Sequence, residues 1–204
     1  MNNSVYQRPN KPRRLTVKNR RDAPEMAFLD VPEVIEIDSF TECHVTPLNV
    51  GCRMVDYLEL NENDKVLEPQ AGTGNLVQAL LDSNHPLNNI VAIERHIGLC
   101  NGLAKRFNHN LSFDPINQCF LEYAQEAAGK VEYPRILLNP PFKMVRKHMN
   151  AALSLLGSGK ERCAIMIALV PITYHHEEAE TLEELPRDTF HTVSVSTKII
   201  QFSR

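Results

Sequence analysis

The sequence predicts one α/β domain with a mostly parallel, seven-stranded sheet, an antiparallel C-terminal hairpin and helices on both faces of the sheet. Short apolar runs alternate with longer segments of 3.6-residue periodicity, which is the pattern of successive β-α-β units. The last two apolar runs are too close together for a helical crossover, so they predict antiparallel neighbours. A length of 204 residues, with 43% hydrophobic and 23% charged residues, suits a single domain that folds without disulfides or metal.

The strands and helices are predicted in order along the chain. Seven apolar or β-rich runs predict strands at 65–68, 89–94, 116–120, 135–138, 163–170, 191–196 and 198–202. Periodic apolar residues predict helices at 46–58, 76–81, 97–107 and 144–156. Thr46 suits the N-cap of the first helix and Pro47 suits its first turn. The run at 163–170 is the most continuous and predicts a central strand, and ligands are expected beyond the C-terminal ends of the strands.

Composition and spacing exclude several classes of protein. No stretch approaches the roughly 18 unbroken apolar residues of a membrane span, and the first residues lack the apolar run of a secretory signal. Five cysteines form neither a C-x-x-C pair nor an even set, so reduced thiols in a cytoplasmic protein fit best. The adjacent His175, His176 and Glu177 cannot converge on one ion, so no metal is predicted. A secreted mini-protein, a membrane protein and a zinc ribbon are excluded.

Positive charge gathers at the N-terminus. Residues 1–21 hold seven basic side chains and no acidic one, whereas the rest of the chain holds 15 basic and 25 acidic side chains. The seven are Arg8, Lys11, Arg13, Arg14, Lys18, Arg20 and Arg21. We therefore predict a basic, flexible N-terminal arm over 1–25, attracted to nucleic acid, and a single domain over 26–204. A solubilising tail without a partner is the alternative.

A glycine-containing turn follows the first predicted strand. It covers residues 68–74 (EPQAGTG), and its glycines let the backbone approach a ligand beside the N-terminus of a helix. Glu94 ends the next strand 20 residues after Gly74, where a carboxylate can accept hydrogen bonds from both hydroxyls of a ribose. Val77 stands where the dinucleotide motif has a small residue, and Glu68 favours a cationic ligand end over a pyrophosphate. The turn and Glu94 together indicate a cofactor that contains adenosine.

The segment 139–142 (NPPF) is the most distinctive motif in the chain. Its two prolines remove two backbone donors, so the segment presents carbonyl groups. Asn139 ends a central predicted strand, and its amide is expected over the ligand site, beside the flat face of Phe142. This arrangement suits a planar substrate that carries an NH₂ group, held by two acceptors and stacked on a ring.

In order and spacing, the turn at 68–74, Glu94 and the quartet at 139–142 resemble the class I S-adenosylmethionine-dependent methyltransferases, which have a Rossmann-like fold. The quartet is similar to that of the branch that methylates N6 of adenine. Residues 44–47 (HVTP) resemble the segment that closes over the methionine part of the cofactor in that branch. The resemblance covers residues 40–204, nearly the whole predicted domain.

The resemblance implies S-adenosylmethionine as cofactor and a role for each matching residue. Cofactor contacts are implied for Thr46, Pro47, Glu68, Ala71, Gly72, Gly74, Glu94, Cys119, Phe120 and Asn139. Among these, the glycine turn and Glu68 are assigned to the methionine end and Glu94 to the ribose. The catalytic set is Asn139, Pro140, Pro141 and Phe142: Asn139 and the Pro140 carbonyl accept the two amino hydrogens, and Phe142 stacks on the base.

The pair Cys119-Phe120 departs from the pattern of the family. In the family, an acidic residue followed by Phe often contacts the amino group of the cofactor's adenine. Phe120 can still pack on the adenine ring, whereas the hydrogen bond either moves to the backbone or is lost.

The resemblance implies transfer of a methyl group to N6 of adenine in nucleic acid, with DNA expected ahead of RNA. Only 18 residues, 171–188, separate the fifth strand from the closing hairpin, and they are acidic, which does not suit a DNA-reading surface. Three explanations are open. Specificity for the DNA sequence is low and binding is aided by the basic arm, a partner protein supplies the specificity, or the substrate is a structured RNA. Two alternatives are a protein glutamine methyltransferase, against which Phe142 argues, and a methyltransferase-like protein that binds cofactor without turnover, against which the intact quartet argues.

Overall fold

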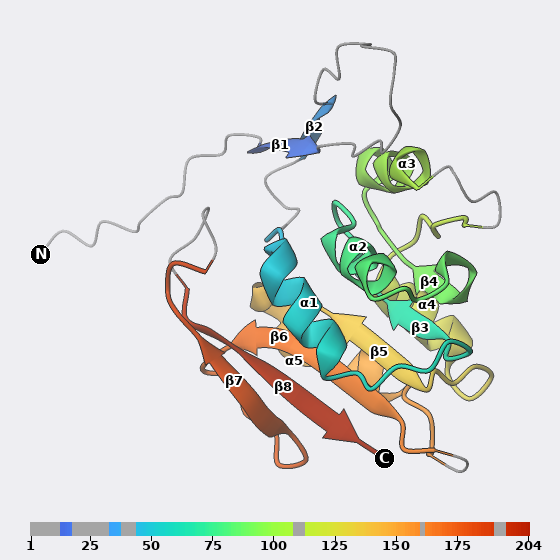
Figure 1. Ribbon diagram of the computed structural model, residues 1–204, viewed down its shortest axis with the longest axis vertical. Helices are drawn as coiled ribbons and strands as arrows, with labels where there is room; N and C mark the ends of the chain where they lie inside the picture. The colour runs from blue at the N-terminus through green and yellow to red at the C-terminus, as the bar shows by residue number, and fades with distance from the viewer. Residues whose placement is uncertain (1–12, 18–32, 38–43, 108–112, 160–161, 190–194) are drawn as a thin grey trace, which may run out of the picture.

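The computed structural model describes residues 13–17, 33–37, 44–107, 113–159, 162–189 and 195–204. Within these residues the main sheet has six strands in the order β4-β3-β5-β6-β8-β7 (Figure 1). The strands are β3 (Val66–Glu68), β4 (Ile90–Ala92), β5 (Arg135–Leu138), β6 (Ile165–Pro171), β7 (Glu180–Leu185) and β8 (Thr197–Ser203). The first four of these in sheet order are parallel, and β8 is antiparallel to both β6 and β7. The predicted mostly parallel sheet with an antiparallel C-terminal pair is confirmed.

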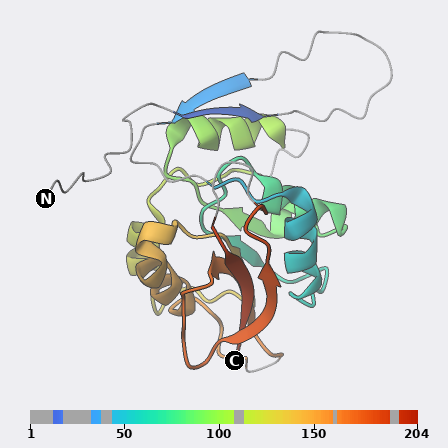
Figure 2. The same ribbon diagram turned by 90° about the vertical axis from the view of Figure 1, so that its left-hand side faces the viewer.

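Two layers of helices cover the two faces of this sheet. The helices α1 (Leu48–Asp56), α2 (Asn75–Asp82) and α3 (Ile97–Arg106) contribute to the core on one face. The helices α4 (Phe120–Ala127) and α5 (Val145–Leu153) pack on the opposite face (Figure 2). Two short 3₁₀ helices, η1 (Leu87–Asn89) and η2 (Phe142–Met144), lead into β4 and α5. The predicted helices on both faces are therefore confirmed.

Strand β6 lies at the centre of the core, as its continuous apolar run predicts. Ile165, Ile167 and Leu169 belong to the cluster that contains α1 and α2. Met166, Ala168 and Val170 belong to the cluster that contains α4 and α5. Because neighbouring side chains of a strand point to opposite faces, a strand covered on both sides needs apolar residues at every position. Each such side chain stabilises the fold by about 1.5–3 kcal/mol when fully buried.

The strand predicted over 116–120 is not formed. Only Ile116 pairs with the sheet, through an isolated parallel bridge to Ile93. The ladder stops there because Asn117 uses its side-chain amide to donate to the carbonyls of Glu94 and Arg95, at 2.9 and 3.1 Å. Helix α4 then begins at Phe120, a helix that the sequence analysis did not predict. The predicted strand at 116–120 was wrong, and a seven-stranded sheet is not confirmed by the described residues.

The closing hairpin has different members from those predicted. The acidic stretch forms β7, which pairs with β8, and residues 191–194 of the predicted partner strand 191–196 lie outside the described part of the chain. Strand β7 is the edge of the sheet, so Glu180 and Glu184 are exposed, Glu183 is half-buried beside Arg53 and Leu185 is buried. Charged residues on an edge strand are usual because they discourage pairing with other chains. The acidity that suggested a loop is therefore compatible with an edge strand.

A second, two-stranded sheet lies outside the main one. Strand β1 (Arg13–Val17), within the predicted arm, pairs antiparallel with β2 (Glu33–Ile37), a pairing that the sequence analysis did not predict. Both views place this sheet beside α3 (Figures 1 and 2). The predicted boundary at residue 25 falls outside the described residues, so the division into arm and domain stays a prediction.

Candidate active site

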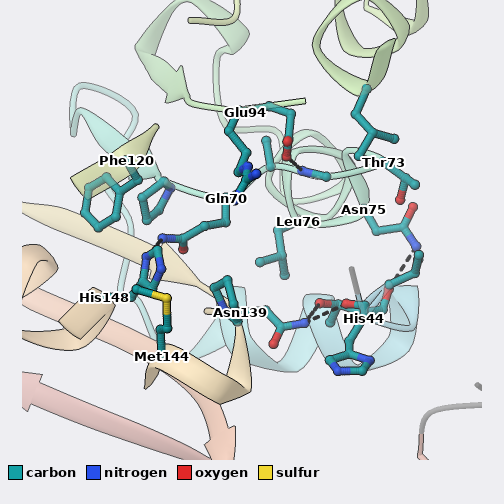
Figure 3. A pocket seen from close by; sticks show the side chains of 18 of the residues that line it. His44, Gln70, Thr73, Asn75, Leu76, Glu94, Phe120, Asn139, Met144 and His148 are labelled. Carbon is teal, nitrogen blue, oxygen red and sulfur yellow. Dashed lines mark hydrogen bonds between the residues drawn. The ribbon is translucent and has the colours of Figure 1, made fainter. Parts of the chain in front are cut away.

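A cavity of about 220 Å³ opens beyond the C-terminal ends of β3, β4 and β5. Its walls come from five segments that are distant in sequence: residues 44–46, 69–76, 94–99, 119–121 and 139–148. Parallel strands bring these segments together because their C-terminal ends lie at one edge of the sheet. Figure 3 shows the side chains that line it.

The structure brings most of the predicted site residues to this cavity. Those that line it are Thr46, Ala71, Gly72, Glu94, Cys119, Phe120, Asn139 and Pro141. Those that do not are Pro47, Glu68, Gly74, Pro140 and Phe142. Of the second group, Pro47 is the N-cap of α1 and Gly74 the N-cap of α2, and each directly follows or borders residues that line the cavity.

The glycine turn has the backbone conformation that only glycine adopts easily. Gly72 has φ of 52° and Gly74 has φ of 85°. A Cβ on Gly74 would lie 2.7 Å from Leu103 Cδ2 and 2.9 Å from a ring carbon of Phe107, so α3 also requires a glycine here. The turn is closed by the Gly74 N–H, which donates to the Ala71 carbonyl at 2.8 Å. The cavity wall is therefore formed by backbone groups.

Glu94 connects this turn to the end of β4. One carboxylate oxygen accepts from the Gly72 N–H at 2.8 Å and the other from the His96 N–H at 2.7 Å. The side chain is 6% exposed, and this burial raises the pKa of the carboxyl above its ordinary value, while the two N–H donors act in the opposite direction. Each oxygen can accept further hydrogen bonds, so the carboxylate can bind a diol without losing these two.

Glu68 lies beneath the turn rather than in the cavity wall. Its residue is fully buried, and desolvation raises its pKa well above the ordinary value, with the nearby Glu94 charge adding to the effect. One oxygen accepts from the Gln70 N–H at 3.3 Å. The other is buried without a hydrogen-bond partner among the described residues. A buried carboxyl in this state suits a cation that approaches it, since a positive charge would stabilise the carboxylate.

The Asn139 side chain is held so that its oxygen is left available. The amide nitrogen donates to the His44 carbonyl at 2.8 Å and to the Thr46 hydroxyl at 3.0 Å (Figure 3). The amide oxygen is buried and has no partner within the described part of the chain. The N-cap prediction for Thr46 was wrong: Pro47 caps α1, and no side chain bonds there. The Thr46 hydroxyl instead orients Asn139, which the local sequence does not reveal.

Phe142 and His44 stack on each other. Their ring centroids are 4.9 Å apart and the planes differ by 28°. Phe142 therefore lies against a histidine from the opposite wall rather than in the cavity lining. A planar group that stacks on Phe142 would use the face that His44 does not cover.

Gln70 and His148 are among the lining residues that the sequence analysis missed. The Gln70 amide nitrogen and His148 Nδ1 are 2.9 Å apart. Burial, aided by the charge of Arg95, lowers the pKa of His148 to about 4, so its ring is neutral near pH 7. His148 also lies parallel to Phe120, with 6.1 Å between ring centroids. The available signal was a histidine four residues after Met144, on the helix face that is otherwise apolar.

Neither a membrane-spanning helix nor a metal site is found among the described residues. None of their helices is long and apolar enough to cross a membrane. In the same residues, no group of three or more His, Cys, Asp or Glu side chains is arranged to hold a metal ion.

No family model matches the chain. By sequence, the chain is 28% identical over 153 residues to the ribosomal RNA small subunit methyltransferase A of Prochlorococcus marinus, a match that covers 74% of this chain and 52% of the relative. The chain spans about half the length of the curated relatives it matches.

Solved structures of methyltransferases share the fold. The type I restriction-modification methyltransferase subunit of Streptococcus thermophilus superposes with a TM-score of 0.64 at 16% identity, covering 78% of this chain and 44% of that chain. An RNA methyltransferase from Salinibacter ruber, in complex with S-adenosyl-L-homocysteine, superposes with a TM-score of 0.54 at 15% identity. The match covers 78% of this chain and 92% of that chain. The chain thus has the Rossmann-like methyltransferase fold, and the resemblance seen in the sequence is confirmed: its relatives and structural neighbours are methyltransferases.

Proposed function

We propose that this protein transfers a methyl group from S-adenosylmethionine to the N6 amino nitrogen of adenine in a nucleic acid. The observation that carries the proposal is the buried oxygen of Asn139, which has no partner among the described residues, while the amide nitrogen already donates to His44 and Thr46. This oxygen can accept a hydrogen bond. Rotating the amide to present its nitrogen instead would break the two hydrogen bonds to His44 and Thr46. The oxygen therefore selects a substrate that donates, as an NH₂ group does.

The residues present fit the cofactor. Glu94 offers two carboxylate oxygens, each with accepting capacity left, to the hydroxyls of a ribose. Glu68 offers a buried oxygen that no described residue bonds, and a cationic amino acid end near it would be favourable. The turn at Gly72 presents backbone rather than side chains, and Phe120 with Leu121 adds apolar surface to the wall. Together these groups match a ligand with a cationic end, a sugar and a flat ring.

The mechanism that this site supports is mainly one of positioning. S-adenosylmethionine supplies a methyl group that is already activated by its sulfonium charge. Asn139 would accept one amino hydrogen at the cavity wall. The resemblance assigns the other to the carbonyl of Pro140, although Pro140 itself does not line the cavity. Two acceptors favour pyramidal geometry at a nitrogen whose lone pair is otherwise delocalised into the ring. The N–C bond forms as the S–C bond breaks, and one amino proton leaves to water. No side chain has to act as a general base.

For the kind of nucleic acid, the relatives favour RNA over the DNA expected from the sequence. The curated relatives are ribosomal RNA methyltransferases by name, at 28% identity. The structural neighbours include both an RNA methyltransferase and a subunit of a restriction-modification enzyme. In the described part of the chain, only a short acidic segment separates β6 from β8, so a partner or the basic arm would supply much of the specificity.

The direct test supplies methyl-labelled S-adenosylmethionine with unmethylated ribosomal RNA and, separately, with unmethylated bacterial DNA. After digestion, we expect the label in N6-methyladenosine. Asn139→Ala should lower the rate by at least about 100-fold, because it removes an acceptor that acts in the transition state. Binding of S-adenosylhomocysteine, measured by calorimetry, should change little.

Asn150→Ala is the matched control, since Asn150 is exposed on α5 and outside the cavity. It should keep full activity. Label in DNA alone would assign the substrate to DNA, and label in protein glutamine would replace adenine by an amide acceptor. Cofactor binding without label in any substrate would contradict the proposed reaction, and full activity of Asn139→Ala would contradict the role of Asn139.

A further inference from the structure

Asn75, the first residue of α2, makes two hydrogen bonds that do not serve its own helix. Its side-chain nitrogen donates to the Thr46 carbonyl at 2.8 Å, and its side-chain oxygen accepts from the Arg106 guanidinium at 3.2 Å. An asparagine at the start of a helix commonly bonds to the local backbone, yet α2 begins without a side-chain cap. The Asn75 amide therefore connects the end of α3 to residues 44–46.

The chemistry of the two partners fixes which way the Asn75 amide points. A guanidinium has only donors and a carbonyl only accepts, so the amide oxygen faces Arg106 and the amide nitrogen faces Thr46. Arg106 is itself held in place, because it donates to the Thr73 carbonyl of the glycine turn at 2.7 Å and lies 5.2 Å from the centroid of the Phe107 ring. Aspartate and leucine have the shape of asparagine, but aspartate lacks the donor and leucine lacks both groups.

Asn139 holds residues 44–46 from a second direction. Its amide nitrogen donates to the His44 carbonyl at 2.8 Å and to the Thr46 hydroxyl at 3.0 Å. Two asparagines from different parts of the chain thus bond to one short segment, and Figure 3 shows both side chains pointing toward it. A shift of this segment would move both acceptors of the Asn139 nitrogen. The position of the Asn139 oxygen therefore depends on what holds residues 44–46.

We infer that Asn75 is a positioning residue, which keeps residues 44–46 in the place where they hold the Asn139 oxygen available to a substrate. This inference rests on the proposed function, because that function assigns the Asn139 oxygen to the amino group of the substrate. Arg106 supports the arrangement by bonding to both Asn75 and the glycine turn. Asn75 also lines the cavity, so a direct contact with the cofactor is the competing role.

The first test measures methyl transfer from labelled S-adenosylmethionine to unmethylated ribosomal RNA and to unmethylated bacterial DNA. Asn75→Asp keeps the size and the acceptor for Arg106 but loses the donor to the Thr46 carbonyl. It should lower kcat by about 10- to 30-fold, because Asn139 is present but displaced. The Kd of S-adenosylhomocysteine, measured by calorimetry, should change by less than about 3-fold. Asn75→Ala, which adds no charge, should divide its effect between kcat and Kd in the same way.

A double variant distinguishes action through Asn139 from any other role. If Asn75 acts through Asn139, adding Asn75→Asp to Asn139→Ala should change kcat by less than about 2-fold, since the group to be positioned is already gone. Gln78→Ala is the matched control. Gln78 lies on the same helix and accepts from Arg106 at 3.4 Å, but it does not line the cavity. This control should keep the kcat of the wild-type protein.

Hydrogen exchange of the Asn139 side chain reads the same contact without any substrate. The Asn139 amide nitrogen donates two hydrogen bonds, so its two protons should exchange slowly with solvent. Their NMR signals can be assigned by their loss in Asn139→Ala. In Asn75→Asp and Asn75→Ala, these protons should exchange at least about 10-fold faster, while the backbone amides of β6 keep their wild-type rates.

The outcomes separate this inference from the proposed function. If the wild-type protein labels neither nucleic acid but exchange responds as expected, the proposed function is wrong and Asn75 still positions Asn139. With an active wild-type protein, three results would overturn the inference and leave the proposed function standing. These are losses that multiply in the double variant, a cofactor affinity that falls as much as kcat, and Asn139 protons that exchange at the wild-type rate in both Asn75 variants. Unchanged exchange in a protein that labels nothing would overturn both.

Discussion

At the scale of single residues, the site keeps buried polar groups at a cost to the stability of the fold. Glu68 is the clearest case, because its carboxyl is fully buried and one of its oxygens has no partner among the described residues. Nothing in the core requires an acid at this point, since Val66 and Leu67 of the same strand are buried among apolar side chains. An acidic residue retained under these conditions is best explained by a cationic ligand that stabilises its carboxylate form.

Replacing Glu68 by Gln should therefore stabilise the protein at neutral and alkaline pH. Because the pKa of Glu68 is raised in the folded state, its contribution to stability is full below the ordinary value of 4.5 and is lost as pH rises through the raised pKa. Each unit of this shift corresponds to about 1.4 kcal/mol. Glutamine does not titrate, so the advantage of Glu68→Gln in the free energy of unfolding should grow from pH 5 to pH 8 in urea titrations.

The same variant should bind S-adenosylhomocysteine more weakly, since the amide cannot compensate the charge of an ammonium group. Greater stability combined with weaker binding would identify Glu68 as a residue retained for its ligand. Parallel stability curves for the two proteins across this pH range would instead show that the carboxyl carries no unfavourable charge in the folded protein.

The residues that the sequence predicted best are those that a motif or a fixed spacing puts at the end of a strand. Glu94 and Asn139 were both placed at strand ends, and both line the cavity. The roles of Thr46 and Gln70 could not be predicted in this way. Thr46 bonds to a residue 93 positions away and Gln70 to one 78 positions away. Such bonds depend on how the strands are ordered in the sheet, which no local pattern contains.

At the scale of elements, packing of α3 against the glycine turn requires a glycine at position 74. Gly74 has φ of 85°, and an added Cβ would lie within 3 Å of both Leu103 and Phe107. By contrast, Gly129 has a similar φ of 71° but no atom within 4 Å of an added Cβ. An alanine would be strained by the positive φ at both positions. Only at Gly74 would its Cβ also clash with neighbouring side chains.

We expect Gly74→Ala to lower the free energy of unfolding by about 2–4 kcal/mol, the sum of left-handed strain and overpacking. Gly129→Ala should lower it by only about 1–2 kcal/mol, from strain alone. Urea denaturation of both variants checks this. Equal losses would mean that α3 moves away from the turn without cost, and α3 would then not help to hold the cofactor-side wall.

Helices and strands were predictable where the periodicity of apolar residues determines them. They were not predictable where a few polar side chains determine whether a strand continues. Strand β5 was predicted with its bounds of Arg135–Leu138, because all four residues are buried. At 116–120, the Asn117 side chain ends the pairing after one residue, and the following residues enter α4 instead. The edge strand β7 was missed because an edge needs only one apolar face, so an acidic composition does not prevent a strand there.

At the scale of the whole molecule, positive charge gathers in the first 21 residues and the rest of the chain carries net negative charge. The seven basic side chains of residues 1–21 contrast with 25 acidic and 15 basic side chains in the remainder. In the described part of this arm, β1 pairs with β2 beside α3, whose N-terminal residues border the cavity. An acidic body would repel a phosphate backbone, so the arm has to supply the attraction if the substrate is a nucleic acid.

Changing all seven basic residues of the arm to Ser should therefore weaken nucleic-acid binding and flatten its dependence on salt. Each phosphate contact contributes about 0.9 to the slope of log K against log salt for duplex DNA and about 0.7 for single strands. If all seven side chains contact phosphates, the slope should fall by as much as about 5 to 6. A control in which the five arginines become lysines keeps the charge and should keep most of the slope, because phosphate attraction depends on charge more than on guanidinium geometry. An unchanged slope in the seven-residue variant would show that the arm is a solubilising tail, and the attraction would then have to come from a partner protein.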